Sequence, residues 1–494
     1  MDFPIILNPG MGPPLWKQLS CSLREAIEHG RLSPGDALPP TRHLAHLLGV
    51  SRDTVVRSYE ELKAQGYVEA ITGSGTFVRR RPVARVSGDS NENGRSTAWR
   101  QAESFRLSQQ AAALANLKLG EATSADQPAL NFGAAPADLL PVRLWREILA
   151  RHSNLRDPLR LDYSADVFGY RPLREAIASY LRRSKGLDCQ ADEIVVFTDS
   201  QHAHDLIARL VINPGDLVVM EDPGYGAARK LFQCYGATVC PIPVDEEGLV
   251  TSELESVRGH CKLIYVTPSH QDPTGAAMSM VRRKALLEWA NRHGAVIIED
   301  AFDSDYRYAS QPMPALMKLD ATGSVLYVYS FWKTLFPIST VGCIVLPPAL
   351  ASLFERSKLL TQRNFPIVEH YALTDFIAEG HLERHIRKTR AIYARRRQAL
   401  IFALSRRLKS AVQFAKESAG LHALVRFDLK RDDETILRCA SEAALPLAST
   451  QPYYVRQSRT GEFLVAFAAL PESQCEEVVD RFVELLTLSD ISRT

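Results

Sequence analysis

The segment SFWKTLFPISTVG, residues 330–342, decides how the rest of the chain is interpreted. It lies between two apolar runs, residues 325–329 and 343–346, that predict buried strands. Lys333 therefore falls on the connection between two strands. A desolvated lysine amine loses its proton more readily and can form a Schiff base with an aldehyde cofactor. On spacing alone, a solvent-exposed lysine with no such role is the more common case.

From residue 130 onward, short apolar runs alternate with longer amphipathic segments. The strand candidates are residues 194–197, 217–220, 263–266, 295–298 and 325–329, and the helix candidates include residues 202–210 and 281–292. This alternation predicts an α/β domain in which helices cover both faces of a mostly parallel sheet. Ligands of such sheets bind at the carboxyl ends of the strands. Ser200, Asp300 and Lys333 all follow strand candidates.

The composition is that of a soluble protein with more than one domain, because 494 residues exceed one ordinary core. With neither a run of about 18 apolar residues nor a signal segment, we expect a cytoplasmic protein without a membrane span. The eight cysteines form no Cys-x-x-Cys pair, so we expect reduced thiols and no metal site. The net charge of +2 means that any nucleic-acid contact depends on a local patch.

The first eighty residues predict a winged helix-turn-helix. A four-residue apolar repeat over residues 14–28 predicts one helix. Thr41 and Ser51 can cap two further helices, residues 42–48 and 51–65, which Gly49 separates. Two short apolar runs flank Thr-Gly-Ser-Gly and predict a hairpin; they are residues 67–71 and 76–78.

Four strings in this region closely resemble the winged helix of GntR regulators: LPPTR at 38–42, SRDTV at 51–55, GYV at 66–68 and GSGTFV at 73–78. The resemblance implies binding to a double-stranded DNA operator. The residues that it places against DNA are Arg42, Arg52, Thr54, Arg57, Gly73 and Gly75. The alternative is a helix-turn-helix used only for protein contacts. The local charge does not decide, because residues 1–80 carry nine basic and eight acidic side chains.

The segment around Lys333, followed by Val-Gly-Cys and Leu-Pro-Pro, resembles the cofactor-lysine segment of fold-type I aminotransferases. It is most similar to the aminotransferase-like domain of the MocR subfamily of GntR regulators. The implied fold class is α/β, with an N-terminal winged helix-turn-helix and a large PLP-dependent aminotransferase-like domain. The resemblance implies pyridoxal 5'-phosphate on Lys333, with Asp300 at the pyridine nitrogen and Tyr225 near the ring. It also implies three phosphate ligands: Ser200, Gln201 and Ser330.

The predicted division is a DNA-binding domain at residues 8–82, a flexible linker at 83–129 and a cofactor and effector domain at 130–490. The linker is polar and turn-rich, although residues 108–120 can form a loose helix. The arginine triplet at 79–81 either contacts phosphates or is simply solvated. A basic helix over residues 387–397 is interpreted chiefly as a solvated face.

Several residues depart from the family pattern. Thr340 replaces the usual phosphate arginine, and Asp199 replaces the glycine that opens the phosphate turn. Losing an arginine to phosphate bond removes about 1.5 to 3 kcal/mol of binding. The tyrosine for the cofactor's phenolic oxygen is Phe302. Three further departures are Trp332 before the lysine, Asp272 before Pro273, and Leu464 where an arginine binds the substrate carboxylate.

Three interpretations follow from the resemblance. The first is a homodimeric transcriptional regulator that binds the cofactor and senses a small amino compound. The second is a regulator that has lost the cofactor and keeps the fold for sensing or dimerisation. The third is a working aminotransferase, which the missing arginines at Thr340 and Leu464 disfavour.

Overall fold

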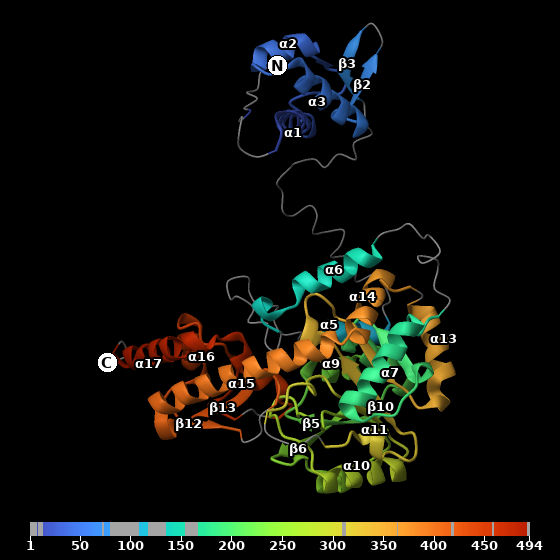
Figure 1. The fold of residues 1–494 in the computed structure, drawn as a ribbon, viewed down its shortest axis with the longest axis vertical. Coiled ribbons are helices and arrows are strands. Elements are labelled where there is room, and N and C mark those ends of the chain that lie inside the picture. The colour runs from blue at the N-terminus through green and yellow to red at the C-terminus, as the bar shows by residue number, and fades with distance from the viewer. Residues whose placement is uncertain are drawn as a thin grey trace. The chain divides into compact units, whose positions relative to one another are not determined.

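The computed structural model describes residues 7, 13–71, 74–79, 108–116, 135–153, 166–308, 313–362, 364–415, 419–456 and 459–491. They belong to two compact units, Met1–Phe105 and Arg106–Thr494 (Figure 1). The predicted domain boundaries, at residues 82–83 and 129–130, lie outside the described residues. No helix in the described ranges is long and apolar enough to span a membrane.

The N-terminal unit is a three-helix domain with a small antiparallel sheet. Its helices are α1 (Leu15–Glu28), α2 (Thr41–Leu48) and α3 (Arg52–Ala64), and its strands are β1 (Ala37–Leu38), β2 (Val68–Ile71) and β3 (Gly75–Val78), in the order β1-β3-β2. The core is apolar, and its fully buried members include Leu19, Leu23, Val55 and Leu62. The winged helix-turn-helix is confirmed. The pairing of β1 with β3 was not predicted, because a two-residue strand leaves no periodic signal.

The two predicted helix caps have different outcomes. Ser51 Oγ accepts a hydrogen bond from the Thr54 amide at 3.1 Å, so this cap is confirmed. The Thr41 cap is wrong, because Thr41 is already helical and the cap position belongs to Pro40, which has no capping side chain. Gly49 ends α2 with φ of 64°, the left-handed conformation that glycine adopts without strain.

An eight-stranded sheet organises the larger unit. Its strands are β4 (Ile194–Phe197), β5 (Leu217–Asp222), β6 (Thr238–Asp245), β7 (Gly248–Leu249), β8 (Cys261–Val266), β9 (Val296–Asp300), β10 (Val325–Ser330) and β11 (Gly342–Val345). The order is β4-β11-β10-β9-β8-β5-β6-β7. The pairs from β6 to β10 are parallel, whereas β11 runs antiparallel to both of its neighbours. The predicted mostly parallel α/β domain is therefore confirmed.

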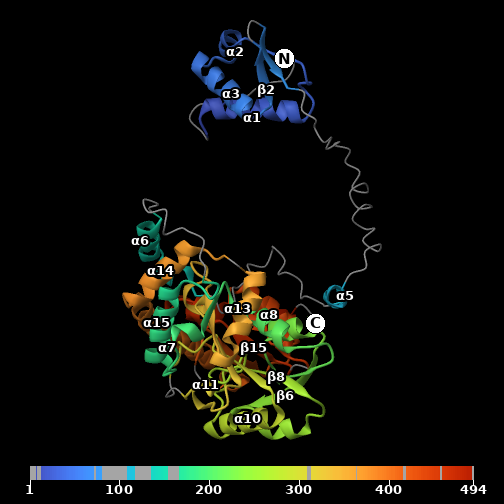
Figure 2. The same ribbon diagram turned by 90° about the vertical axis from the view of Figure 1, so that its right-hand side faces the viewer.

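Alternate residues of β10 show which helices cover each face of the sheet. Leu326 and Val328 pack with α8 (Ser200–Val211), α9 (Gly226–Cys234) and α13 (Ala351–Thr361). Tyr327 and Tyr329 pack with α6 (Val142–His152), α7 (Arg171–Lys185), α14 (Ile367–Ala378) and α15 (His381–Leu408). Val325 lies on this second face too, with α10 (Met280–His293) and α11 (Leu316–Leu319) (Figure 2). Helices cover both faces, as predicted.

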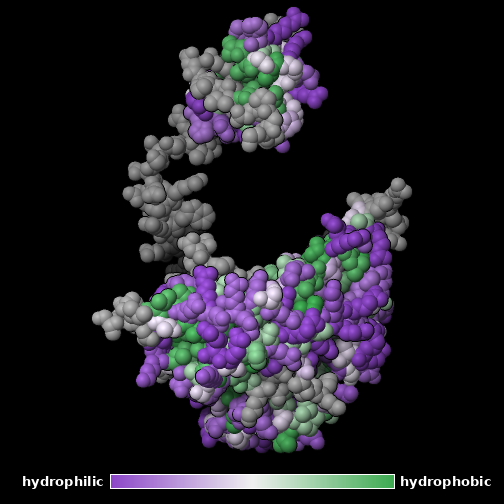
Figure 3. Space-filling view, turned by 60° about the vertical axis from the view of Figure 1, so that its left-hand side comes forward, coloured by the Kyte–Doolittle hydropathy of each residue, from purple (hydrophilic) through white to green (hydrophobic). Residues whose placement is uncertain are grey.

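A second sheet, which the sequence did not predict, follows the long helix α15. It contains β12 (Val412–Phe414), β13 (Ala423–Phe427), β14 (Leu447–Ser449) and β15 (Glu462–Val465), packed with α16 (Asp433–Glu442) and α17 (Cys475–Ile491). In Figure 1 this C-terminal part lies to one side of the large sheet. Figure 3 shows mainly hydrophilic residues, with smaller hydrophobic areas, on the face of the larger unit that it presents.

Candidate cofactor site and DNA-binding surface

Lys333 lies on a short helix, α12 (Trp332–Leu335), between β10 and β11. The prediction that it connects two buried strands is confirmed. Its Nζ lies 5.3 Å from the ring centroid of Phe302 and 5.3 Å from that of Trp332. Two departures from the family pattern therefore form aromatic walls beside the amine, where a ring face attracts a cation.

Asp300 is the last residue of β9 and is 4% exposed. The Tyr265 hydroxyl donates to its Oδ2 at 2.7 Å, and His204 Nε2 lies 3.2 Å from the same oxygen. Its other oxygen, Oδ1, has no hydrogen-bond partner among the described residues. A buried carboxylate oxygen without a donor is costly. Asp300 therefore presents an acceptor that is suited to a protonated ring nitrogen.

Tyr225 lies beside this carboxylate, directly before α9. Its ring centroid is 6.4 Å from that of Tyr265 and 6.3 Å from that of His204. Burial raises the pKa of Tyr225, and the nearby charges of Asp300, Asp272 and Asp199 raise it further. The structure thus brings together Tyr225 and Asp300, which the sequence placed about 75 residues apart.

The candidate phosphate ligands meet where α8 begins. Ser330 pairs with Gly342 across β10 and β11, and a Cβ built on Gly342 would lie 3.6 Å from the Ser200 amide nitrogen. No described residue accepts a hydrogen bond from the amides of Ser200 or Gln201. Asp199 caps the helix, because its carboxylate accepts from the His202 amide at 2.9 Å. The site therefore offers two amides and two hydroxyls, with an acidic side chain beside them.

The side chains of Ser330 and Gln201, two of the candidate phosphate ligands, make few hydrogen bonds within the protein. Ser330 Oγ accepts from the Trp332 amide at 3.1 Å, which leaves its own proton available to a ligand. Gln201 Nε2 donates to Ala227 O at 3.4 Å, and its Oε1 has no partner among the described residues.

A buried titratable cluster surrounds Lys333, and the sequence reasoning missed most of it. Burial raises the pKa of Asp272 to about 7 and that of Asp303 to about 6, and Lys333 opposes both shifts. Burial lowers the pKa of His270 to about 3 and lowers that of His422 strongly, and Lys333 adds to both shifts. His270 and Asp272 belong to the segment SHQDPTG, residues 269–275, of which the sequence analysis singled out only Asp272. Nothing near His422 signalled its position.

An apolar cavity of about 660 Å³ opens next to Tyr225. Its walls include Gln201, Tyr453 and Leu464, together with Leu114 from a helix in the predicted linker, α5 (Gln109–Asn116). The loose helix predicted at 108–120 is confirmed over residues 109–116 and packs on α9, and residues 117–120 lie outside the described residues. Leu464 gives this wall an aliphatic side chain where the family resemblance implied an arginine.

The predicted DNA contacts lie on α2, α3 and the wing. Arg42, Arg52 and Arg57 are exposed, and Arg57 Nε forms an ion pair with Asp53 Oδ2 at 2.9 Å. Thr54 is half-buried, with its hydroxyl 2.8 Å from Ser51 Oγ. Gly75 is exposed and has φ of 120°, a conformation that strains other residues. Gly73 lies outside the described residues.

The fold and the site define a class: a winged-helix DNA-binding protein joined to an aminotransferase-type cofactor domain. Comparisons with known families agree. Residues 15–78 match the bacterial regulatory proteins of the gntR family, and residues 138–482 match aminotransferase class I and II.

The chain belongs to the MocR subfamily of GntR-type transcriptional regulators. It is 35% identical to a probable rhizopine catabolism regulatory protein, MocR, of Rhizobium meliloti, over 88% of this chain and 86% of the relative. It is 30% identical to the pyridoxine biosynthesis transcriptional regulator PdxR of Corynebacterium glutamicum, over 87% of each chain. A kynurenine aminotransferase of Pyrococcus horikoshii superposes with a TM-score of 0.65 at 27% identity, covering 79% of this chain and 96% of that one.

Proposed function

We propose that this transcriptional regulator binds pyridoxal 5'-phosphate through Lys333 and that its affinity for DNA changes when a small amino compound enters the site. The unpartnered Asp300 Oδ1 carries the proposal, because a pyridinium nitrogen would supply the missing donor. When bound, the cofactor supplies an aldehyde that reacts reversibly with amines. The chain's own residues would bind and orient it.

Each residue of the site has a distinct task in this proposal. Asp300 would keep the ring nitrogen protonated, and Tyr265 would orient that carboxylate through its 2.7 Å hydrogen bond. Tyr225 would pack near the ring. The amides of Ser200 and Gln201, at the positive end of α8, would bind the phosphate together with the Ser330 hydroxyl.

The cavity beside Tyr225 favours an amine with an apolar body. Leu114, Leu231 and Leu464 line it, and Leu464 offers no positive charge to an α-carboxylate. A polar amino acid would lose water at these leucines, and among the described lining residues only Lys230 could pair with its carboxylate. The amino compound that we propose therefore carries its amine on a largely hydrophobic skeleton.

The helix α5 supports a route from this cavity to the DNA-binding unit. It packs on α9, and its Leu114 forms part of the cavity wall. It is also the described helix that follows the winged helix in sequence. A ligand that displaces Leu114 would shift the anchor of the linker and so alter how far the DNA-binding units can reach.

We also propose a homodimer that presents two recognition helices to a repeated operator. Three leucines on α13 support an interface there: Leu353, Leu359 and Leu360 are 46%, 45% and 81% exposed. Large exposed apolar side chains grouped on one helix are typical of a surface that another chain covers.

The first experiment is an absorbance spectrum after incubation with pyridoxal 5'-phosphate and dialysis. We expect a retained near-visible band in the wild type and in Lys388→Ala, which removes an exposed lysine of α15. The band should be absent from Lys333→Ala. A wild type that retains no cofactor, or a Lys333→Ala variant that retains it in the same form, would refute the proposal.

A cofactor-free regulator is the second candidate, and Asp199 is the observation that favours it. Its carboxylate lies at the start of α8 and accepts from the His202 amide, where a phosphate would bring two more negative charges. In that case the dialysed wild type would be colourless, and the larger unit would bind its effector without covalent capture.

A further inference from the structure

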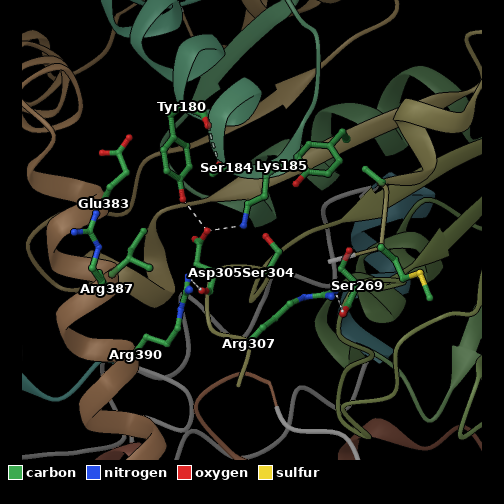
Figure 4. A pocket seen from close by; sticks show the side chains of 14 residues that line it. Tyr180, Ser184, Lys185, Ser269, Ser304, Asp305, Arg307, Glu383, Arg387 and Arg390 are labelled. Atoms are coloured by element: carbon green, nitrogen blue, oxygen red, sulfur yellow. Dashed lines mark hydrogen bonds and ion pairs between the residues drawn. The ribbon is translucent and has the colours of Figure 1, made fainter. Parts of the chain in front are cut away.

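Figure 4 shows a second cavity, of about 350 Å³. It lies on the opposite face of the large sheet from Asp300. Its lining includes Tyr327, whose side chain packs with α7 and α15, whereas Tyr265, the hydrogen-bond donor to Asp300, packs with α8 and α9. Tyr180 and Lys185 of α7 and Arg387 and Arg390 of α15 also line it. None of the residues assigned above to the cofactor belongs to this cavity.

Asp305 forms the floor of this cavity, and its negative charge is already compensated. Lys185 Nζ donates to its carboxylate at 2.5 Å, and the hydroxyls of Tyr180 and Tyr329 donate at 2.7 and 2.6 Å. Burial raises the pKa of Asp305, but these donors outweigh burial and hold it below its usual value. Glu383 is the other acid in the lining: its Oε1 accepts a hydrogen bond from Arg183, and its Oε2 has no hydrogen-bond partner among the described residues.

Apart from these two acids, the charged side chains in the cavity lining are basic, and three of them are arginines. Arg387 and Arg390 lie three residues apart on one face of α15, and neither forms an ion pair with a carboxylate of the described residues. Arg390 Nη2 donates to the Asp305 carbonyl at 2.7 Å, and Arg307 Nη2 donates to the Ser269 carbonyl at 2.6 Å. Backbone carbonyls orient these two guanidiniums, and a backbone carbonyl leaves the charge of Arg390 in place.

The positive charges of the neighbouring arginines also affect the buried Lys185. Burial lowers the pKa of Lys185, Asp305 raises it, and Arg307 and Arg390 lower it further. Two cations thus act on a third within the same cavity.

The sequence led us to interpret the helix at 387–397 as a solvated face. Its first part is exposed, but it lines a concave surface. Farther along, Arg396 is buried and donates to Ala468 O at 2.6 Å, so there the interpretation is wrong.

We propose that this cavity binds a small phosphate-bearing anion. Guanidinium groups match the oxygens of a phosphate with paired N–H donors, and three of them line the cavity. Serine hydroxyls complete the donors: Ser184, Ser269 and Ser304. The volume lies in the range of small-ligand sites and exceeds what inorganic phosphate fills, so a phosphate monoester should bind more tightly than phosphate itself.

The test is isothermal titration of the full-length protein with orthophosphate and with glycerol 3-phosphate at constant chloride. We expect both to bind, the monoester more tightly, and Arg387→Gln and Arg390→Gln each to weaken binding about tenfold. Arg395→Gln is the matched control, because Arg395 lies on the same helix and bonds to Glu472 at 2.8 Å outside the cavity. It should bind as the wild type does.

Ser330→Ala separates this cavity from the cofactor site: it should remove only the heat of phosphate bound at the cofactor site and keep the binding that Arg387→Gln and Arg390→Gln weaken. Arg387→Lys keeps the charge without the planar fork, so it should fall between wild type and Arg387→Gln. The proposal fails if the wild type gives no heat beyond the chloride control. It also fails if both glutamine variants bind normally, or if Ser330→Ala alone abolishes binding.

Discussion

Asp199 places an acidic side chain at the proposed phosphate site. Its carboxylate caps α8 and faces the place proposed for the phosphate. We expect Asp199→Gly to bind pyridoxal 5'-phosphate about tenfold more tightly, because it removes one like charge, whereas replacing a capping residue by glycine costs only a few tenths of a kcal/mol of stability. Absorbance titration measures the affinity.

The matched control is Asp432→Gly, which removes the equivalent cap of α16, where Asp432 Oδ1 accepts from the Thr435 amide at 2.7 Å. It should cost similar stability and leave cofactor binding unchanged. Equal affinities in wild type and Asp199→Gly would show that the acidic cap does not limit binding.

Asp272 should make stability depend on pH. Burial raises its folded pKa to about 7 from 3.8, so the unfolded state releases this proton at lower pH than the folded state. The stability is therefore fully present below about pH 4 and decreases as the pH rises to about 7. Asp272→Asn should remove this decrease. Between pH 4 and pH 8 the variant should therefore lose less stability than the wild type, by on the order of 4 kcal/mol.

Urea unfolding at pH 4.5 and pH 8 measures this difference. Asp188→Asn is the control, because the Asp188 side chain is 86% exposed. A parallel pH profile for Asp272→Asn and wild type would mean that Asp272 stays ionised in the folded protein.

At the scale of elements, α3 should carry the operator contacts. Arg52 is exposed at the first position of the helix, so we expect Arg52→Ala to weaken operator binding about tenfold. Lys63→Ala, at the exposed far end of α3, should have a smaller effect. Fluorescence anisotropy with labelled operator DNA measures both affinities. Equal losses would mean that general charge, not the start of α3, determines binding.

The linker helix α5 provides a second test at this scale. Leu114→Asp should reduce the difference in operator affinity between cofactor-loaded and cofactor-free protein, because it removes the apolar contact with the cavity. Leu488→Asp changes an exposed leucine of α17 and should preserve that difference. If both variants respond like wild type, α5 does not transmit the signal.

The sequence predicted the elements that have strong periodicity and missed those that do not. The strand predicted at 194–197 coincides with β4, whose four residues are all buried and form one apolar run. In contrast, β14 has three residues, two of them half-buried, and gives no such signal. The candidate site was predictable where motifs surround it, as for Lys333 and Asp300. His422 approaches from the distant C-terminal region, and only tertiary packing brings it to Lys333.

For the whole molecule, the exposed leucines of α13 predict how the chain assembles. We expect light scattering to give twice the 55.0 kDa of one chain, and Leu360→Asp to shift the protein toward monomer, because a charge would be buried at the interface. Leu488→Asp is again the control. A monomeric wild type at micromolar concentration would contradict the proposed dimer.

Residues 300–308 belong to both proposed sites. Asp300 and Asp303 lie near Tyr225 and Lys333, and a few residues later Asp305 and Arg307 line the cavity on the other face of the sheet. A ligand that moves this segment from one side moves groups that face the other. Gene expression would then depend on the joint concentrations of an amine and a phosphorylated metabolite, so the regulator would compare two nutrient supplies and not measure one.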